Sequence, residues 1–351
     1  MPPFYELPQR IKAWAQELGF ADAGIAELSL DADREHLRRW LDEGLHGQMA
    51  FMGRDLEKRV HPEGLRPGTL SVISLRLDYR PQAEAAQAVL DDGERAYISR
   101  YALGRDYHKL MRGRLLKLGA RLEREVGPHG YRVLTDSAPA LEKALARNAR
   151  LGWIGKNTLL LNRKAGSWFF LGEIYTDLPL AASEQALSGN HCGSCTACLD
   201  VCPTKAFVAP YRLDARKCIS YLTIEHRGAF PLELRAAIGN RVFGCDDCQL
   251  VCPWNRYAQP TAEADFAPRH GLDTAKLVEL FGWDEATWLR NTEGMALRRL
   301  DHARWLRNLA IGLGNAPRSA EVRGALNARA EHPDEAVREH VRWALEQQEC
   351  G

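Results

Sequence analysis

Eight of the nine cysteines in this 351-residue chain lie between residues 192 and 252, and their spacing constrains the fold more than any other feature. The first run has the pattern Cys-x2-Cys-x2-Cys-x3-Cys-Pro and comprises Cys192, Cys195, Cys198 and Cys202. In bacterial ferredoxins this pattern places three thiolates on one 4Fe–4S cubane and the fourth on a neighbouring cubane. The run therefore predicts a segment organised by two iron–sulfur clusters.

A second, shorter run supplies further ligands, namely Cys245, Cys248 and Cys252, and Cys218 lies between the two runs. Exchanging the last cysteine of each run between the clusters gives a first set of Cys192, Cys195, Cys198 and Cys252. The second set is then Cys202, Cys218, Cys245 and Cys248. Two adjacent clusters indicate an electron relay to a second centre in the protein. The main alternative is a pair of structural zinc sites, which also use Cys-x2-Cys pairs.

The composition and the N-terminus point to the compartment. No run approaches the ~18 apolar residues that cross a bilayer, and the first ten residues carry prolines and a glutamate where a signal peptide would be apolar. We therefore expect a cytoplasmic protein, in which clustered cysteines bind metal more often than they form disulfides. With 45% hydrophobic and 26% charged residues, the chain is neither disordered nor a small disulfide scaffold.

Three parts are predicted along the chain. Residues 1–180 alternate helical and strand patterns, which favours an α/β domain with strands at 69–77, 131–135 and 167–177 and a helix at 107–126. Residues 181–260 hold the cysteine runs and predict a small ferredoxin-like domain that is organised by its ligands. Residues 261–351 are helical in pattern and resemble HEAT-type repeats, with an ordinary helical bundle as the alternative.

Familiar nucleotide fingerprints are missing from the first part. The chain has no Gly-x-Gly-x-x-Gly, and residues 152–158 depart from a phosphate loop because Arg150 stands where its first glycine would be. We interpret these residues as a tight glycine turn that shapes a cofactor pocket. Residues 106–108 begin like a cobalamin-ligating motif, but Met111 replaces its glycine, so His108 is not expected to bind cobalt.

Asp136 carries the strongest catalytic signal among the titratable residues. It ends the strand expected at 131–135, and sites in α/β domains form at the carboxyl edge of strands. Apolar neighbours would raise the pKa of this carboxyl group and suit it to donate a proton. The alternative is that Asp136 caps a helix that begins near Ala140.

The formal net charge of +1 conceals an uneven distribution. Residues 95–164 contain sixteen Lys or Arg against five Asp or Glu, an excess of eleven positive charges. Residues 298–329 contain seven arginines against two acidic residues. Such segments are typical of a surface that binds a polyanion, and the alternative is a solvated helix face.

Taken together, these segments resemble the epoxyqueuosine reductase family, cobalamin-dependent iron–sulfur enzymes of queuosine synthesis in tRNA. The resemblance rests on the cysteine runs and on residues 98–109, 136–143, 152–158, 218–225 and 244–255. It implies an α/β cobalamin-binding domain, a ferredoxin-like domain with two 4Fe–4S clusters, and a C-terminal helical HEAT-like domain that binds tRNA. The implied reaction removes an epoxide oxygen as water, with two electrons and two protons, at the anticodon wobble position.

The resemblance also implies roles for individual residues. It makes Asp136 the proton donor and places a substrate pocket at Asp106, Tyr107, His108 and Lys143. The expected cofactor-binding residues are Arg59, Lys156, Asn157 and Ser220. The basic segments would contact tRNA phosphates, with C-terminal contacts from Arg298, Arg299, Arg304 and Arg307.

Other functions and partners stay open at this point. A reductive dehalogenase-like enzyme would share the core domains without needing arginine-rich C-terminal helices. A non-catalytic iron–sulfur electron carrier would have no use for a proton donor at Asp136. Besides tRNA, the expected partner is an unidentified cytosolic electron donor, and no sustained heptad or apolar stripe demands a second subunit, so we expect a monomer.

Overall fold

A four-stranded sheet forms the centre of the first half of the chain in the computed structural model, which describes residues 6–184, 189 and 191–349. In sheet order its strands are β1 (Asp22–Ala26), β2 (Ser71–Asp78), β7 (Phe169–Thr176) and β4 (Tyr131–Leu134). Every neighbouring pair is antiparallel, so the sheet has no common carboxyl edge. Each predicted strand is present, and Asp136 follows the carboxyl end of β4 as expected.

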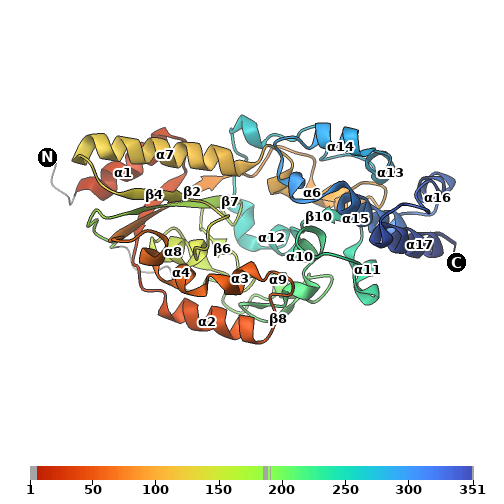
Figure 1. Cartoon of the computed structure of the whole chain (residues 1–351), viewed down its shortest axis with the longest axis horizontal. Helices are drawn as coiled ribbons and strands as arrows, with labels where there is room; N and C mark the ends of the chain where they lie inside the picture. The colour runs from red at the N-terminus through yellow and green to blue at the C-terminus, as the bar shows by residue number, and fades with distance from the viewer. Residues whose placement is uncertain (1–5, 185–188, 190, 350–351) are drawn as a thin grey trace.

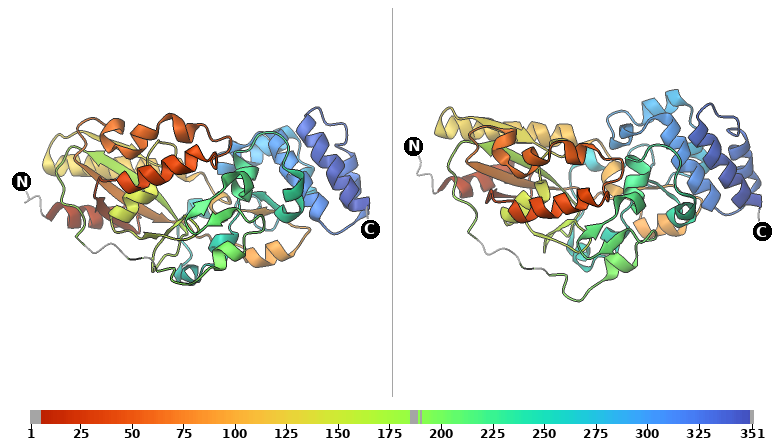
Figure 2. Two further views of the ribbon diagram at one scale, coloured as in Figure 1. Left: turned by 90° about the horizontal axis from the view of Figure 1, so that it is seen from below. Right: turned by 60° about the horizontal axis from the view of Figure 1, so that its bottom comes forward.

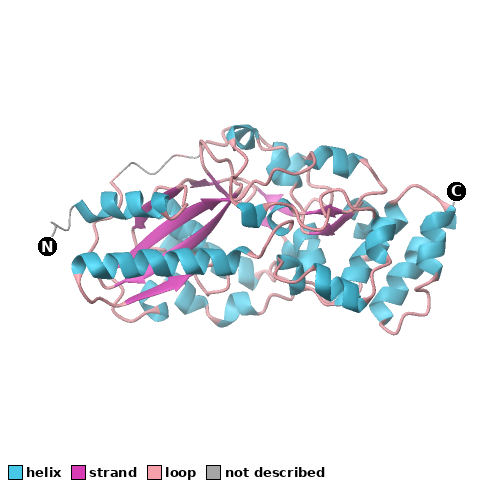
Figure 3. Ribbon diagram, turned by 90° about the horizontal axis from the view of Figure 1, so that it is seen from above, coloured by secondary structure: helices cyan, strands magenta, loops and turns pink. Residues whose placement is uncertain are grey.

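Helices cover both faces of this sheet (Figures 1 and 3). The helices α1 (Leu7–Glu17) and α7 (Tyr107–Val126) lie on one face, and α8 (Glu142–Asn148) lies on the other. Because side chains alternate along a strand, Ile73 and Leu75 pack with α1 and α7, whereas Val72 packs with α8. This double cover explains why β2 is buried along nearly its whole length.

Short elements fill the connections between the strands. They are α2 (Asp31–Asp42), α3 (Phe51–Arg54), α4 (Leu56–Val60), α5 (Pro62–Leu65), α6 (Ala86–Asp91), β3 (Tyr97–Ile98) and the 3-10 helix η2 (Arg100–Ala102). The glycine turn at residues 152–158 lies within a hairpin of β5 (Trp153–Ile154) and β6 (Leu160–Leu161).

The cysteine-bearing segment is made of short elements, and one short helix lies within each cysteine run. Its elements are α9 (Ala197–Asp200), β8 (Phe207–Ala209), β9 (Arg212–Leu213), η3 (Ala215–Lys217), α10 (Ile219–Ile224), α11 (Leu232–Ile238), β10 (Arg241–Phe243), α12 (Asp247–Leu250) and η4 (Pro253–Tyr257). Strand β10 pairs in parallel with β3, which joins this segment to the residues that precede α7.

The C-terminal part is helical, as predicted, and lies at the opposite end of the molecule from α1 (Figure 1). Its elements are η5 (Ala264–Phe266), α13 (Leu277–Phe281), α14 (Glu285–Asn291), η6 (Ala296–Arg299), α15 (His302–Asn315), α16 (Ala320–Asn327) and α17 (Glu335–Glu349). None of the described helices is long and apolar enough to cross a membrane.

One hydrophobic core joins the cysteine segment to the C-terminal helices (Figure 2). Leu222 of α10 and Phe243 of β10 belong to the same buried cluster as Leu306 and Leu309 of α15. The expectation that residues 181–260 are organised by their ligands without a large core is therefore wrong. Apolar residues of α10 and β10 face α15, so the two predicted parts share one core across residue 260.

Candidate functional site

Asp136 occupies a turn immediately after β4, in a left-handed backbone conformation with φ of 51°. Its N–H donates to Glu142 Oε1 at 2.5 Å. Its carboxylate Oδ2 lies 3.0 Å from His108 Nε2 and 2.8 Å from Arg299 Nη2. Its side chain caps no helix, because α8 begins at Glu142 after Leu141. The capping alternative is therefore wrong, and Asp136 is held by three contacts from separate parts of the chain.

His108 lies between two carboxylates in the first turn of α7. Its Nδ1 lies 2.6 Å from Asp106 Oδ1, and the same oxygen accepts the backbone N–H of His108 and so caps the helix. The ring of Tyr107 stacks between His108 and Phe170, with centroid separations of 4.3 Å and 3.7 Å. The structure thus brings Asp106, Tyr107, His108 and Asp136 together.

The charges at this site differ from the sequence-based expectation. Burial by itself would raise the pKa of Asp136, but the hydrogen bond with His108 and the charge of Arg299 lower it to about 2. Burial would lower the pKa of His108, but its hydrogen bonds to Asp106 and Asp136 raise it to about 9. The predicted high pKa of Asp136 is therefore wrong in this arrangement, and at neutral pH the proton resides on His108.

A pair of buried carboxyl groups lies directly behind Asp136 and was missed from the sequence. Glu173 of β7 is 0% exposed and accepts a hydrogen bond from Ser74 Oγ at 3.3 Å. Burial and the charge of Asp136 raise the pKa of Glu142 to about 8, and burial beside Glu142 raises that of Glu173 as well. At neutral pH both carboxyl groups are therefore protonated for most of the time. A single glutamate within the apolar strand of residues 169–176 was the available signal.

Arg299 brings the C-terminal part to this site from the end of η6. Its guanidinium pairs with Asp136 and lies 4.0 Å from Glu225. Arg304 donates to the carbonyls of Arg299 and Ile224, at 2.6 and 3.0 Å. The two arginines line a cavity of about 330 Å³ together with Gln48, Phe51, Ile224, Glu225 and Arg227. Two arginines expected to hold phosphates therefore form one wall of this cavity.

Arg307 does not lie on the surface. It is 1% exposed, and its guanidinium donates to the carbonyls of Leu222, His226 and Gly228. The expectation that Arg307 contacts tRNA is therefore wrong, because its donors are used inside the protein. Arg298 is exposed, donates to the Leu289 carbonyl, and leaves part of its guanidinium open to solvent.

The residues expected to bind cofactors separate into two groups. Lys156 donates to the carbonyls of Gly193 and Cys195, at 2.7 and 2.9 Å, and Asn157 donates to the carbonyl of Cys248 at 3.3 Å. Both therefore lie at the cysteine runs. Arg59 lies elsewhere, where it donates to the Phe51 carbonyl at 3.1 Å and keeps a buried Nε without a protein partner.

Two other expected residues lie near these groups. Ser220 is half-buried in α10, two residues after Cys218. Lys143 donates to the Thr158 carbonyl at 2.8 Å. The side chain of Lys143 is exposed, and it lines neither of the two cavities described here.

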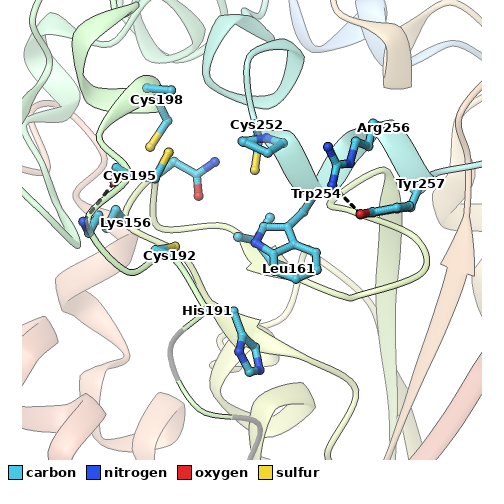
Figure 4. A pocket seen from close by; sticks show the side chains of 13 residues that line it. Lys156, Leu161, His191, Cys192, Cys195, Cys198, Cys252, Trp254, Arg256 and Tyr257 are labelled. Carbon is cyan, nitrogen blue, oxygen red and sulfur yellow. Dashed lines mark hydrogen bonds between the residues drawn. The ribbon is translucent and has the colours of Figure 1, made fainter.

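The first cysteine set surrounds a cavity of about 230 Å³ (Figure 4). Its sulfur atoms belong to Cys192, Cys195, Cys198 and Cys252, which come from both runs. This is the crossover arrangement expected from the spacing. All eight cysteines between residues 192 and 252 are free of disulfides.

The second cysteine set lies further inside. Cys248 is close to Cys218 and Cys202, and Cys245 is close to Cys218. Between Cys245 and Cys248, buried Asp246 accepts hydrogen bonds from Tyr97, Ser99 and the backbone of Arg100. These bonds fix the inner set beside the segment that leads to Tyr101 and the Asp106–His108 turn.

Comparison with known proteins identifies the family. A family model described as "4Fe-4S double cluster binding domain" matches residues 191–255, and one described as "Epoxyqueuosine reductase QueG, DUF1730" matches residues 59–137. The epoxyqueuosine reductase of Pseudomonas aeruginosa is 61% identical over 97% of this chain and 94% of its own length. This chain belongs to the epoxyqueuosine reductase family.

Other epoxyqueuosine reductases agree with this assignment. The Escherichia coli enzyme is 51% identical over 98% of this chain and 90% of its own length. A crystal structure of epoxyqueuosine reductase with an epoxyqueuosine-modified tRNA-Tyr stem loop superposes with a TM-score of 0.89 and 27% identity, covering 99% of this chain and 91% of that one. The Bacillus subtilis epoxyqueuosine reductase, at 26% identity, a TM-score of 0.89 and the same coverage, has been seen with its aspartate-bearing catalytic loop swung out of the active site.

Proposed function

We propose that this chain reduces epoxyqueuosine in tRNA to queuosine. The observation that carries the proposal is the contact of Asp136 with protonated His108, in a member of the epoxyqueuosine reductase family. The net reaction adds two electrons and two protons to an epoxide, releases its oxygen as water and leaves an alkene. A site for this reaction needs a source of electrons, a source of protons and a pocket for the modified base.

His108 and Asp136 supply the protons. The imidazolium of His108 has an N–H on each ring nitrogen, and these donate to Asp106 and Asp136. Asp136 passes a proton drawn from His108 to the departing oxygen, while Asp106 keeps the ring oriented and charged. Arg299 stabilises the carboxylate of Asp136 between proton transfers. Asp136 thus remains the residue that delivers the proton, and His108 is its reservoir.

Two 4Fe–4S clusters and cobalamin would supply the electrons, and this chain has residues that would hold each group. Four thiolates in each set match the ligand number of a cubane, so the cysteines fit two clusters. The buried Nε of Arg59, which has no partner in the protein, fits a polar group of cobalamin, and Ser220 is its proposed counterpart beside the inner cluster. Cobalamin, when bound and reduced, supplies the electrons that open the epoxide. The free cysteines suit a reducing compartment such as the cytoplasm.

The cavity next to Arg299 suits the modified base and its flanking phosphates. Phe51 exposes its ring there, and bases extruded from RNA commonly stack on aromatic side chains. Arg227 lines the cavity, and Arg298 precedes Arg299 in the chain; both side chains are exposed and can reach phosphate oxygens. We propose that tRNA binds across this cavity, with the C-terminal helices and the exposed basic residues of 95–150 as additional contacts.

Mass analysis of nucleosides tests the proposed function. Epoxyqueuosine-containing tRNA is incubated anaerobically with the reconstituted protein and dithionite, then digested. We expect queuosine to form, and Asp136→Asn to slow its formation by about 100-fold or more while tRNA binding stays normal. The matched control is Asp42→Asn, at an exposed acidic residue of α2. Full activity of Asp136→Asn would remove the proton-delivery role, and no queuosine from the unchanged protein would refute the function.

A further inference from the structure

The outer cysteine set has an exposed member, whereas the four cysteines of the inner set are half-buried. Cys195 is exposed, and so are the adjacent Gly193, Ser194 and Thr196. At the inner set, Cys245 and Cys248 are flanked by Asp246 and other buried residues. An electron that arrives from another protein would therefore reach the outer cluster first, because electron transfer requires close approach of the two centres.

Unpaired positive charges surround the exposed outer set. Lys156 and Arg256 line its cavity, and Arg163 contacts the lining residue His191 at 3.0 Å. Lys205 donates to the Asp200 carbonyl, in the loop that carries the first cysteine run. In the described parts of the chain none of these four cations has a carboxylate within ion-pair distance, whereas Arg66 and Arg147 each pair with an aspartate. The exposed Lys164 adds a fifth positive charge. The loop that carries the first cysteine run also holds an exposed acidic residue, Asp200.

Exposed apolar side chains lie among these charges. Tyr257 is 43% exposed and lies under the guanidinium of Arg256, at 4.7 Å from its ring centroid. Val251 and Val201, which precede the last cysteine of each run, are exposed as well. An apolar centre with a charged rim is the usual composition of a protein–protein interface. The outer cluster is therefore surrounded by a surface that is suited to docking and carries an excess of positive charge.

We propose that this surface docks a small acidic, low-potential ferredoxin-type protein that reduces the outer cluster. The inference rests on the proposed function, since it needs the two clusters. Each encounter transfers one electron, so the carrier is oxidised and the outer cluster reduced, and two encounters supply the two electrons for one epoxide. The outer cavity and the cavity at Arg299 have no lining residue in common, so the carrier and the tRNA can bind through different residues.

Stopped-flow measurement of cluster reduction tests this docking surface without requiring turnover. The variant is Arg163→Glu with Lys164→Glu, two exposed residues in the loop after β6, and the probe is a reduced acidic 2Fe–2S ferredoxin at low salt. We expect the second-order rate constant to fall by about tenfold, and the difference from the unchanged protein to shrink at high salt. Reduction by dithionite, a small molecule that needs no docking surface, should not change.

A matched control reverses two charges elsewhere. Lys117→Glu with Arg124→Glu changes the net charge equally on α7, which covers the sheet face opposite α8. This control should keep the rate with ferredoxin. Equal rates for the Arg163/Lys164 variant and the unchanged protein would overturn the proposal, as would an equal loss in the α7 control. Because cluster reduction is read separately from queuosine formation, a failed epoxide reduction with normal cluster reduction would refute the proposed function and leave the docking surface supported.

Discussion

The guanidinium of Arg299 lies 2.8 Å from the carboxylate of Asp136, although 163 residues separate the two along the chain. The contact joins the turn after β4 to the end of η6, so the C-terminal part completes the site formed by the sheet domain. It also helps keep Asp136 ionised while His108 holds the proton. The charge at Asp136 is therefore set by tertiary contacts rather than by its own burial.

Removing the guanidinium should raise the pKa of Asp136. In Arg299→Met the carboxylate loses a positive charge, and burial then dominates its titration. We expect the pKa of Asp136 to move up from about 2, as followed by carboxyl carbon NMR, while Arg299→Lys shows a smaller change because one charge remains. An unchanged pKa in Arg299→Met would mean that this contact does not control the carboxylate.

The rate should depend on pH through His108. Since its pKa is raised to about 9, the imidazolium persists through neutral pH, and epoxide reduction should fall as the pH rises through about 9. The same sign holds for stability: the contribution of His108 is complete below its unfolded pKa and is lost as the pH rises through the folded value. In Asp106→Asn the rate of epoxide reduction should begin to fall at a lower pH, because His108 loses one of the hydrogen bonds that raise its pKa. A pH profile identical in both proteins would argue against His108 as the proton reservoir.

Glu142 should act by positioning the turn of Asp136. Glu142→Gln keeps an oxygen that accepts the Asp136 N–H, whereas Glu142→Ala leaves this donor without its partner. We expect the alanine variant to lose about 1–3 kcal/mol of local stability and most activity, and the glutamine variant to retain activity. Hydrogen exchange of the peptide that contains residues 131–141 measures the turn directly. Equal protection in the two variants would show that this hydrogen bond does not hold the turn.

Substitution of Arg307 should lower the stability of the protein, whereas substitution of Arg298 should weaken its binding to tRNA. Arg307→Met leaves three carbonyls, one of them fully buried, without their donor, so we expect a loss of about 3 kcal/mol in the free energy of unfolding, measured with urea. Arg298→Ala, at an exposed side chain, should leave stability nearly unchanged, weaken tRNA binding and reduce its salt dependence by about one charge. If Arg307→Met instead weakened tRNA binding and left stability unchanged, Arg307 would be a phosphate contact after all.

Local sequence patterns were sufficient to predict several individual helices and strands. Short apolar segments predicted the strands β2, β4 and β7, and apolar residues at helical spacing predicted α7. Both signals come from residues that are neighbours along the chain. The cysteine spacing likewise predicted that Cys192, Cys195, Cys198 and Cys252 lie together, since the crossover is a property of the motif; their role as cluster ligands stays a prediction. The sequence analysis made no prediction of strand direction, because an isolated apolar strand has no signal for the orientation of its partner; the structure shows that the neighbouring strands of the central sheet are antiparallel.

The sequence by itself determined which residue types are available: eight cysteines in two runs, the Asp106–Tyr107–His108 turn, Asp136 and the arginine-rich segments. Only the tertiary structure decided how those groups are charged and which are accessible. It placed Asp136 against His108 and Arg299, buried Glu173 behind Glu142, and enclosed Arg307 among carbonyls. The physical reason is that pKa values and exposure depend on groups brought together across long sequence separations, and no local pattern records those distances.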